Sequence, residues 1–153
     1  MAGFATYNAQ VQAFEQRVRE SFRRQAFMVT IGAELVCVTP GAVEIRVRFT
    51  QHLTQQNNFV HAGVITSILD SACGYAALSV APENAEVLSV EFKVNLLAPA
   101  VGESFIARSQ VKRAGKTLTV CTADAFAVNQ GNEKLVAIMQ ATIMNMIPQP
   151  LPG

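Results

Sequence analysis

Apolar positions follow a helical spacing in two segments of the chain. The first spans about residues 7–26, where apolar side chains three or four positions apart share one side: Val11, Phe14, Val18 and Phe22. This spacing is typical of an amphipathic helix. The second segment, about residues 61–80, is apolar on every side and stops just before Pro82. A helix of this composition is predicted to be buried.

Elsewhere apolar and polar residues alternate, as they do in strands with one buried face. One predicted strand shows the alternation clearly, with these residues on its apolar side: Val43, Ile45, Val47 and Phe49. The third strand has another such row: Val90, Phe92, Val94 and Leu96. Together the patterns predict strands over about residues 31–38, 42–50, 89–96, 103–112, 117–128 and 133–146.

This order of elements predicts an α+β fold in a single domain, residues 1–147. An antiparallel sheet wrapped around the long central helix would bury that helix on all sides, with the N-terminal helix added outside. The proline-rich residues 148–153 cannot extend a strand and are expected to form a loose tail. Consecutive hairpins leave sheet edges exposed, so we expect two chains to associate as a homodimer.

The charge balance excludes several classes of partner. The 153 residues carry 12 Lys and Arg against 11 Asp and Glu, so no strong field attracts nucleic acid or anionic lipid. The apolar segment 62–82 is long enough to tempt a transmembrane interpretation. Asp70 and the lack of flanking Lys or Arg argue against it. We therefore expect no nucleic-acid partner and no membrane span.

Cys37, Cys73 and Cys121 are an odd set without a C-x-x-C pair. This pattern argues against a disulfide framework or a zinc site, and favours reduced thiols in the cytoplasm as small core residues. The first residues lack the basic and apolar blocks of a signal peptide. The two histidines, His52 and His61, have no neighbouring cluster of Cys or acids, so no metal site is predicted.

Asp70 is the only charged residue between His61 and Glu83. A carboxylate in so apolar a segment is costly to bury unless it is hydrogen-bonded or belongs to a functional site. The structural explanation is a carboxylate satisfied by Thr66, Ser71 or neighbouring backbone groups. The polar turn just upstream of the helix favours a functional site instead.

Three motifs resemble those of hotdog-fold acyl-CoA thioesterases, most closely the phenylacetate-degradation thioesterase branch. The first is residues 57–75, in which Asp70 follows His61-Ala62-Gly63 at nine positions from the histidine. The second is Ser89-Val90-Glu91-Phe92 with the turn at 97–103, and the third is Arg113-Ala114-Gly115-Lys116-Thr117. The resemblance covers about residues 30–145 and implies the hotdog fold.

The resemblance also implies hydrolysis of an aryl- or medium-chain acyl-CoA to the free acid and coenzyme A. Asp70 would act as general base or nucleophile, and the backbone N–H of Ala62 would be the oxyanion donor. Ser89 and Gln55 would orient the attacking water, and His61 would orient the substrate or cap the helix. The family usually has glycine at position 62 and often asparagine at position 55, so Ala62 and Gln55 depart from its pattern.

Four further residues are expected at the substrate: Asn58, Gly63, Arg113 and Lys116. Arg113 and Lys116 are suitable partners for the phosphates of coenzyme A. Coenzyme A enters as part of the substrate, and no other cofactor is implied. The expected assembly is a homodimer or a dimer of dimers.

Helix geometry predicts that the site is shared between two chains. Ala62 and Asp70 are eight positions apart, which is a rise of about 12 Å at roughly 1.5 Å per residue. A single thioester carbon has to lie within roughly 3 Å of both groups. We therefore predict that Ala62 of one subunit faces Asp70 of its partner.

Two other functions stay open at this point. A non-catalytic acyl-CoA-binding module is favoured by the departures at Ala62 and Gln55. A hotdog-fold enoyl-CoA hydratase or dehydratase would need a histidine with an acid. His61 and Asp70 lie on one helix without the spacing of a hydratase, so this alternative has weaker support.

Overall fold

The computed structural model describes the backbone of residues 2–147 and the side chains of residues 13–147. The elements follow in this order: α1 (Ala2–Arg24), α2 (Ala26–Thr30), β1 (Ala33–Thr39), β2 (Ala42–Arg48), the short 3-10 helix η1 (Gln51–Leu53), α3 (Ala62–Val80), β3 (Glu86–Leu96), β4 (Ser104–Ala114), β5 (Leu118–Asn129) and β6 (Asn132–Met146). Residues 148–153, predicted as a loose tail, lie outside the described residues.

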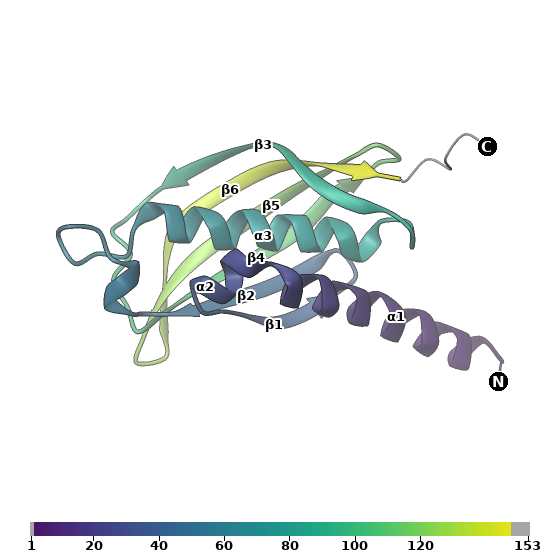
Figure 1. Cartoon of the computed structure of the whole chain (residues 1–153), viewed down its shortest axis with the longest axis horizontal. Helices are drawn as coiled ribbons and strands as arrows, with labels where there is room; N and C mark the ends of the chain where they lie inside the picture. The colour runs from purple at the N-terminus through teal and green to yellow at the C-terminus, as the bar shows by residue number, and fades with distance from the viewer. Residues whose placement is uncertain (1, 148–153) are drawn as a thin grey trace.

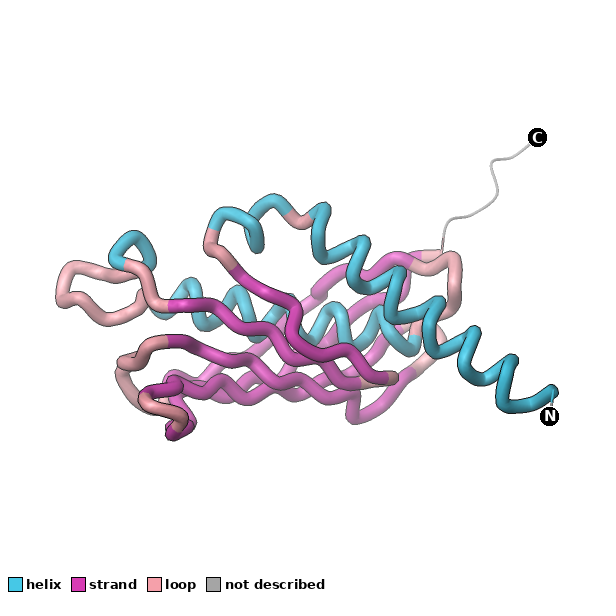
Figure 2. Tube along the Cα trace, turned by 90° about the horizontal axis from the view of Figure 1, so that it is seen from below, coloured by secondary structure: helices cyan, strands magenta, loops and turns pink. Residues whose placement is uncertain are grey.

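The six strands form one antiparallel sheet in the order β1-β2-β4-β5-β6-β3. α3 packs across one face of this sheet and contacts all six strands (Figures 1 and 2). α1 lies outside, against α3 and β1. The sheet therefore surrounds the long helix, and the predicted α+β hotdog fold is confirmed.

The hydrophobic core lies between α3 and the sheet. Ile68, Leu69 and Ala72 of α3 have no exposed surface, and they share one buried cluster with Phe105 and Ile143 of the strands. By length and composition alone α3 could span a membrane, but 67% of its most apolar window is buried inside the fold. α3 is therefore a core helix, as its all-round apolar sequence predicted.

α1 is anchored to α3 at two places. Buried Phe22 packs edge-on against Tyr75 of α3, with 5.6 Å between the ring centroids. Further along, the guanidinium of Arg17 donates to carbonyls at the end of α3 and in the turn that follows: Leu78, Ala81, Pro82 and Glu83. The last carbonyls of a helix lack their regular intrahelical donors, and Arg17 supplies a charged donor at the C-terminal end of α3.

Two boundaries differ from the sequence prediction. Residues 26–30 form the short helix α2, which is held by buried Met28; the strand predicted from residue 31 begins at Ala33. Gly32 adopts a φ of 67°, which redirects the chain between these elements. Phe49, predicted to share the buried face of β2, lies beyond the end of that strand and is exposed.

The prediction that all three cysteines are core residues is wrong for Cys37. Cys73 and Cys121 are fully buried, and the Cys121 thiol donates to the Cys73 carbonyl at 3.5 Å. The register of β1 shifts between Leu35 and Cys37, which turns the Cys37 side chain outward. A bulge of this kind leaves no pattern in the apolar residues around it.

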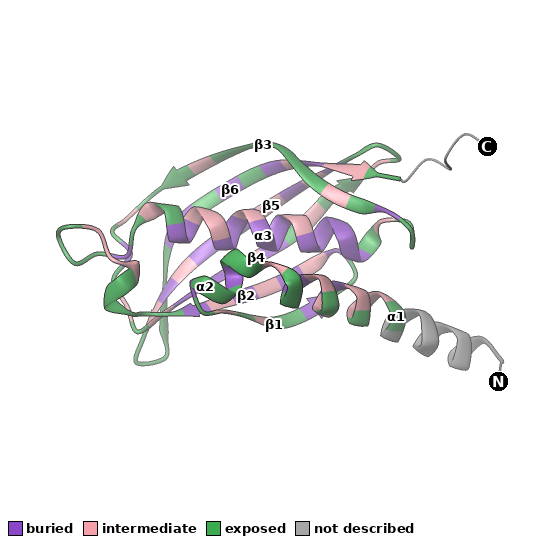
Figure 3. Ribbon diagram, viewed as in Figure 1, coloured by how far each residue is buried: buried purple, intermediate pink, exposed green. Residues whose placement is uncertain are grey.

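β3 is an edge strand, and its apolar residues do not all face the core. Its register with β6 shifts between Ser89 and Glu91, so the predicted alternation is interrupted at Val90. Most of β3 is coloured as exposed in Figure 3. Four of its apolar side chains are exposed, and we call them the β3 edge patch: Leu88, Val90, Phe92 and Leu96. The sheet thus has an apolar edge that has no partner strand within the described residues.

Candidate active site

Asp70 lies half-buried in the middle of α3 and faces β3. The hydroxyl of Ser89 donates to Asp70 Oδ1 at 2.7 Å. Ser71 bonds Gln25 instead, so neither Ser71 nor Thr66 holds the Asp70 carboxylate among the described residues. The structure therefore brings two of the predicted site residues together and rejects the proposed structural partners.

A pocket of about 290 Å³ opens beside this pair. We call it the Asp70 pocket, and it is lined by α1 and its end, α3 and β3: Ser21, Gln25, Asp70, Ser71, Gly74, Tyr75, Glu86, Val87, Leu88 and Ser89. The carboxamide of Gln25 accepts a hydrogen bond from Tyr75 at 3.3 Å and donates to Ser71 at 3.4 Å. Burial raises the pKa of Tyr75, so its hydroxyl is a neutral donor at physiological pH.

The start of α3 presents a free backbone donor. His61 is the N-cap, and its Nδ1 accepts from the Gly63 N–H at 2.8 Å. The backbone carbonyl of His61 accepts a hydrogen bond from the Val64 N–H at 2.9 Å. Within the described residues the Ala62 N–H donates to no other group. His61 is therefore a capping residue, and Ala62 rather than Gly63 has an N–H available to a ligand at the positive end of the helix.

The loop before α3 is held by its own polar side chains. Asn58 adopts a φ of 62°, a left-handed conformation that asparagine tolerates, and its side chain accepts from Gln51 at 2.9 Å. Gln55 Oε1 accepts from the Asn57 N–H. Asn58 thus shapes the turn, and Gln55 is a polar loop residue that reaches the space beside Ala62.

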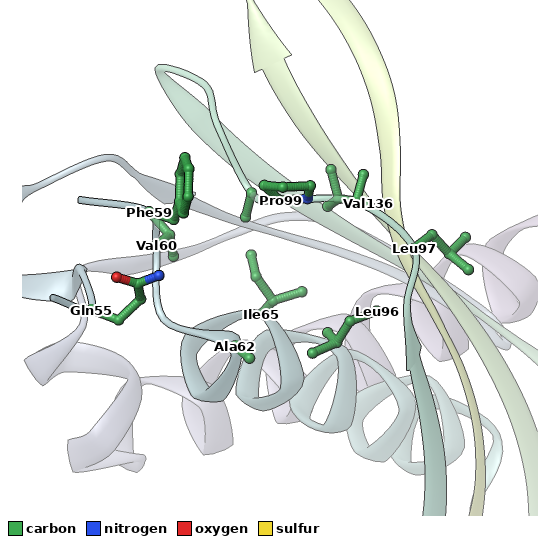
Figure 4. A pocket seen from close by; sticks show the side chains of 11 residues that line it. Gln55, Phe59, Val60, Ala62, Ile65, Leu96, Leu97, Pro99 and Val136 are labelled. Carbon is green, nitrogen blue, oxygen red and sulfur yellow. The ribbon is translucent and has the colours of Figure 1, made fainter. Parts of the chain in front are cut away.

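That space is a second pocket, of about 420 Å³, which we call the Ala62 pocket. Its lining comes from the loop, the start of α3, the end of β3 and β6: Gln55, Phe59, Val60, Ala62, Ile65, Leu96, Leu97, Ala98, Pro99, Ala100 and Val136. In Figure 4 Ile65 points from α3 toward Phe59, Val60 and Pro99. Apart from Gln55 and the backbone, the lining is apolar.

Ala62 and Asp70 line different pockets of one chain, as their helical separation predicted. The free N–H belongs to the Ala62 pocket, and the carboxylate belongs to the Asp70 pocket. Nothing in the described part of a single chain brings both groups to one atom.

Comparisons with known proteins decide the family. A family model described as "Thioesterase superfamily" matches residues 57–134, a span that includes both Ala62 and Asp70. The chain belongs to the thioesterase superfamily. The resemblance stated from the motifs is confirmed, and membership of this superfamily supports hydrolysis of a thioester.

Individual proteins that are similar to this chain agree with the family assignment. The crystal structure of a thioesterase family protein from Silicibacter pomeroyi is 50% identical, with a TM-score of 0.87 over 88% of this chain and 99% of that chain. "Putative esterase SSO1253" of Saccharolobus solfataricus is 28% identical over 120 residues, covering 78% of this chain and 77% of that protein. The E. coli PaaI protein from the phenylacetic acid degradation operon shares the fold, with 20% identity, a TM-score of 0.79 and coverage of 89% and 95%.

The basic hairpin of this thioesterase-superfamily chain lies on the Asp70 side of the molecule. Ser89, Ile143 and Thr119 share one row across β3, β6 and β5, and the hairpin of residues 114–117 follows directly beyond that row. Asn145 Nδ2 donates to the carbonyls of Gly115 and Lys116 at 3.0 and 3.3 Å and holds the turn. Arg113 and Lys116 are exposed and form no ion pair among the described residues.

Metal chemistry finds no support in the described residues. They contain no group of three or more His, Cys, Asp or Glu side chains that could hold a metal ion. His52 lies exposed in η1 and lines neither the Ala62 pocket nor the Asp70 pocket. The sequence analysis missed Gln25 of the Asp70 pocket, because its place beside Asp70 depends on how α1 packs.

Proposed function

We propose that the protein is an acyl-CoA thioesterase that hydrolyses an aryl- or medium-chain acyl-CoA. Asp70 takes a proton from water as the water oxygen attacks the thioester carbonyl carbon, or attacks that carbon itself. The carbonyl oxygen becomes negative and is stabilised by the Ala62 N–H. When water is the nucleophile, the C–S bond then breaks, coenzyme A leaves as a thiolate that takes the proton from Asp70, and the free acid remains. When Asp70 is the nucleophile, breaking the C–S bond leaves an anhydride between Asp70 and the acyl group. Water then hydrolyses this anhydride to the free acid and the Asp70 carboxylate, and the coenzyme A thiolate takes up the proton released from the water.

One observation carries the proposal: a carboxylate and a free helix-start N–H lie in two separate pockets of the same chain. Each is useful to thioester hydrolysis, and each lacks the other within its own chain. A two-fold arrangement that joins the Ala62 pocket of one protomer to the Asp70 pocket of its partner supplies both groups twice. We therefore infer a homodimer with two shared sites.

The exposed edge of β3 supports this assembly. Strands with long apolar edges are normally covered, and β3 contributes Ser89 to one pocket and Leu96 to the other. Pairing of two chains along this edge would bury the β3 edge patch close to both pockets. A further pairing into a dimer of dimers is compatible with this scheme.

The first test is thiol release from a panel of aryl- and alkyl-CoA esters. The wild-type protein is expected to turn over at least one ester, and Asp70→Asn is expected to lower kcat by about a thousandfold with unchanged circular dichroism. Tight binding of acyl-CoA without thiol release would support a binding module. Water addition to enoyl-CoA would support a hydratase.

Hybrid dimers test whether the site is shared. Ala62→Pro removes the proposed oxyanion donor at the first helical position, where proline fits and the extended His61 can precede it. Neither Ala62→Pro nor Asp70→Asn should turn over alone. Refolding them together should restore about a quarter of wild-type activity, because half of the dimers then carry one intact site. Inactive mixtures of correctly folded hybrid dimers would reject the shared site.

A further inference from the structure

Gln25 lies at the break between α1 and α2 and does not follow the rule for its position. It is the N-cap residue of α2, yet its side chain forms no capping hydrogen bond. N-cap positions favour short polar side chains, which bond the backbone of the helix that they precede. The longer side chain of Gln25 crosses to α3 instead and bonds Ser71 and Tyr75. Departures from such local rules are expected at functional or strained sites.

Ser71 differs from the other two serines of α3. Ser67 and Ser79 donate to carbonyls of their own helix at 2.6 and 2.7 Å, as serines within helices commonly do. The Ser71 hydroxyl donates to Gln25 Oε1 at 3.5 Å and accepts from Gln25 Nε2 at 3.4 Å. The hydroxyl of Tyr75, one turn further on, donates to the same Oε1 at 3.3 Å. Two buried hydroxyls of α3 are thus tied to α1.

This tie and the bond to Ser89 hold α3 from two sides. Successive residues point about 100° apart around a helix, so Asp70 faces β3 while Ser71 faces α1. The outer surface of a helix lies roughly 5–6 Å from its axis, so a rotation of about 10° would move the Asp70 carboxylate by about 1 Å. A misplacement of about 1 Å can lower a rate by about a hundredfold. The rotation of α3 about its axis is therefore critical for Asp70.

Other contacts of α1 keep Gln25 in place. Phe22, one turn before Gln25, packs edge-on against Tyr75 with 5.6 Å between the ring centroids. Arg17 binds carbonyls at the end of α3. α1 therefore follows the C-terminal half of α3, from the level of Ser71 onward (Figure 1). The matching family model begins at residue 57, so the match assigns no role to any residue of α1.

We propose that Gln25 is a positioning residue for Asp70. By bonding Ser71 and Tyr75 it fixes the rotation of α3, and this rotation holds the Asp70 carboxylate toward Ser89. The inference rests on the proposed thioesterase function and adds α1 to the parts of the chain that this function needs. The alternative is that Gln25 only satisfies two buried hydroxyls, while core packing alone sets the rotation of α3.

Two replacements of similar length separate these roles. Gln25→Met fills the same space without the hydrogen bonds, and it should lower kcat about tenfold while KM stays within about twofold. Gln25→Glu can accept from both hydroxyls and should recover most of kcat at about pH 8, where its carboxylate and that of Asp70 are ionised. Gln16→Met is the matched control and should change neither constant. Gln16 is exposed on α1 and donates to Glu20 of the same helix.

A double-variant cycle tests whether Gln25 and Tyr75 act as one unit. Tyr75→Phe removes one hydroxyl and keeps the ring, so it should lower kcat by a smaller factor than Gln25→Met. The combined variant should be no slower than Gln25→Met alone, because both changes break the same link. Losses that multiply in the combined variant would mean that the two side chains act independently, and would overturn the proposal.

A crystal structure of Gln25→Met reports the position of Asp70 without turnover. The distance from the Ser89 hydroxyl to Asp70 Oδ1, 2.7 Å in the wild type, should exceed about 3.5 Å, beyond the range of a hydrogen bond. An unchanged distance would overturn the positioning role.

Two kinetic patterns would overturn it as well. One is a raised KM with unchanged kcat in Gln25→Met, the behaviour of a side chain that only binds substrate. The other is equal kcat in Gln25→Met and Gln25→Glu. Absence of thiol release from every ester by the wild-type protein would instead reject the thioesterase function, and the crystal structure would still decide whether Gln25 positions Asp70.

Discussion

The two edge strands of the sheet meet their surroundings differently. β1 is shielded within the chain, because α1 and α2 pack against it. Arg19 of α1 donates to the Leu35 carbonyl of β1 at 3.3 Å, and the bulge at Val36 interrupts the strand. β3 also carries a bulge, but the four apolar side chains of the β3 edge patch remain exposed.

The exposed edge strand, β3, is also the one that lines both pockets. β3 supplies Ser89 to the Asp70 pocket and Leu96 to the Ala62 pocket, whereas β1 lines neither of them. Natural proteins protect edge strands with helices, bulges or charges. The β1 edge of this sheet is covered by helices of the same chain. We infer that the β3 edge is covered by a second copy of the chain, which also supplies the groups missing from each active site.

Among changes that test the comparison of the two edge strands, the largest effect is expected from a charge placed on the exposed edge of β3. Phe92→Lys puts an ammonium group into the β3 edge patch, where 44% of the phenylalanine is exposed. Burying that charge in a dimer is unfavourable, so the variant should be monomeric by light scattering. It should also lose thioesterase activity by about a hundredfold, because each proposed site combines groups from two chains.

Val36→Lys is the matched control on the shielded edge. Val36 is similarly exposed, at 39% of its surface, but belongs to β1. This variant should keep the oligomeric state and the activity of the wild type. A monomeric and fully active Phe92→Lys protein would contradict the role given to β3, and dissociation of Val36→Lys alone would place the interface on β1.

A second prediction concerns the shield over β1. Arg17 holds α1 against the end of α3 through four carbonyls. Arg17→Ala should lower the free energy of unfolding by about 2 kcal/mol, since hydrogen bonds from a charged donor are lost. Denaturant titration measures this change, and Arg23→Ala at an exposed position of the same helix should change the free energy by less than about 0.5 kcal/mol. Equal effects would show that Arg17 contributes only as surface charge.

A third prediction concerns Ser89, which ties β3 to the Asp70 carboxylate, the group proposed to act as base or nucleophile. Ser89→Ala removes the hydrogen bond to Asp70 Oδ1, so we expect kcat to fall about tenfold while the dimer persists. Ser89→Thr keeps a hydroxyl and should recover most of that loss. If Ser89 had only a structural role, Ser89→Ala would have a lower melting temperature, and Ser89→Thr would not recover kcat.

Much of this molecule follows from local sequence patterns. The buried helix was predictable because residues 62–80 are apolar on every side, and the sheet because the strands alternate. The register shifts beside Val36 and Val90 were not, since a bulge adds one residue without marking the sequence. Cys37 was therefore placed on the wrong face. α2 was missed because a helix of five residues is fixed by the burial of Met28 and not by propensity.

The candidate site was predictable to the extent that its residues lie on α3. Asp70 stands out by its isolated charge, and Ala62 by its place at the helix start. Gln25 and Ala98 were missed because they reach the pockets only through tertiary packing. The family motifs added Ser89, which alternation alone would have placed among ordinary surface hydroxyls.

The smallest effect on stability is expected from a change to an ion pair on the outer face of the sheet, between the two edge strands. Arg108 of β4 bonds Glu44 of β2 at 2.7 Å and Glu133 of β6 at 2.6 and 2.7 Å, so it links the β1 side of the sheet to the β3 side. The Arg108 guanidinium lowers the pKa of Glu133. Because the pKa of Glu133 is lower in the folded state, its contribution is present above the unfolded value of about 4.3 and disappears as pH falls through the folded value.

Glu133→Gln should therefore lower the free energy of unfolding by about 0.5 kcal/mol at pH 7, a small value because the pair is solvent-exposed. The difference between the two proteins should vanish in denaturant titrations below about pH 3. Dimerisation should be unaffected, since the residue belongs to neither edge strand. A difference that grows toward acid pH would mean that Glu133 is stabilised in its protonated form, and the ion pair would then contribute nothing to joining the two sides of the sheet.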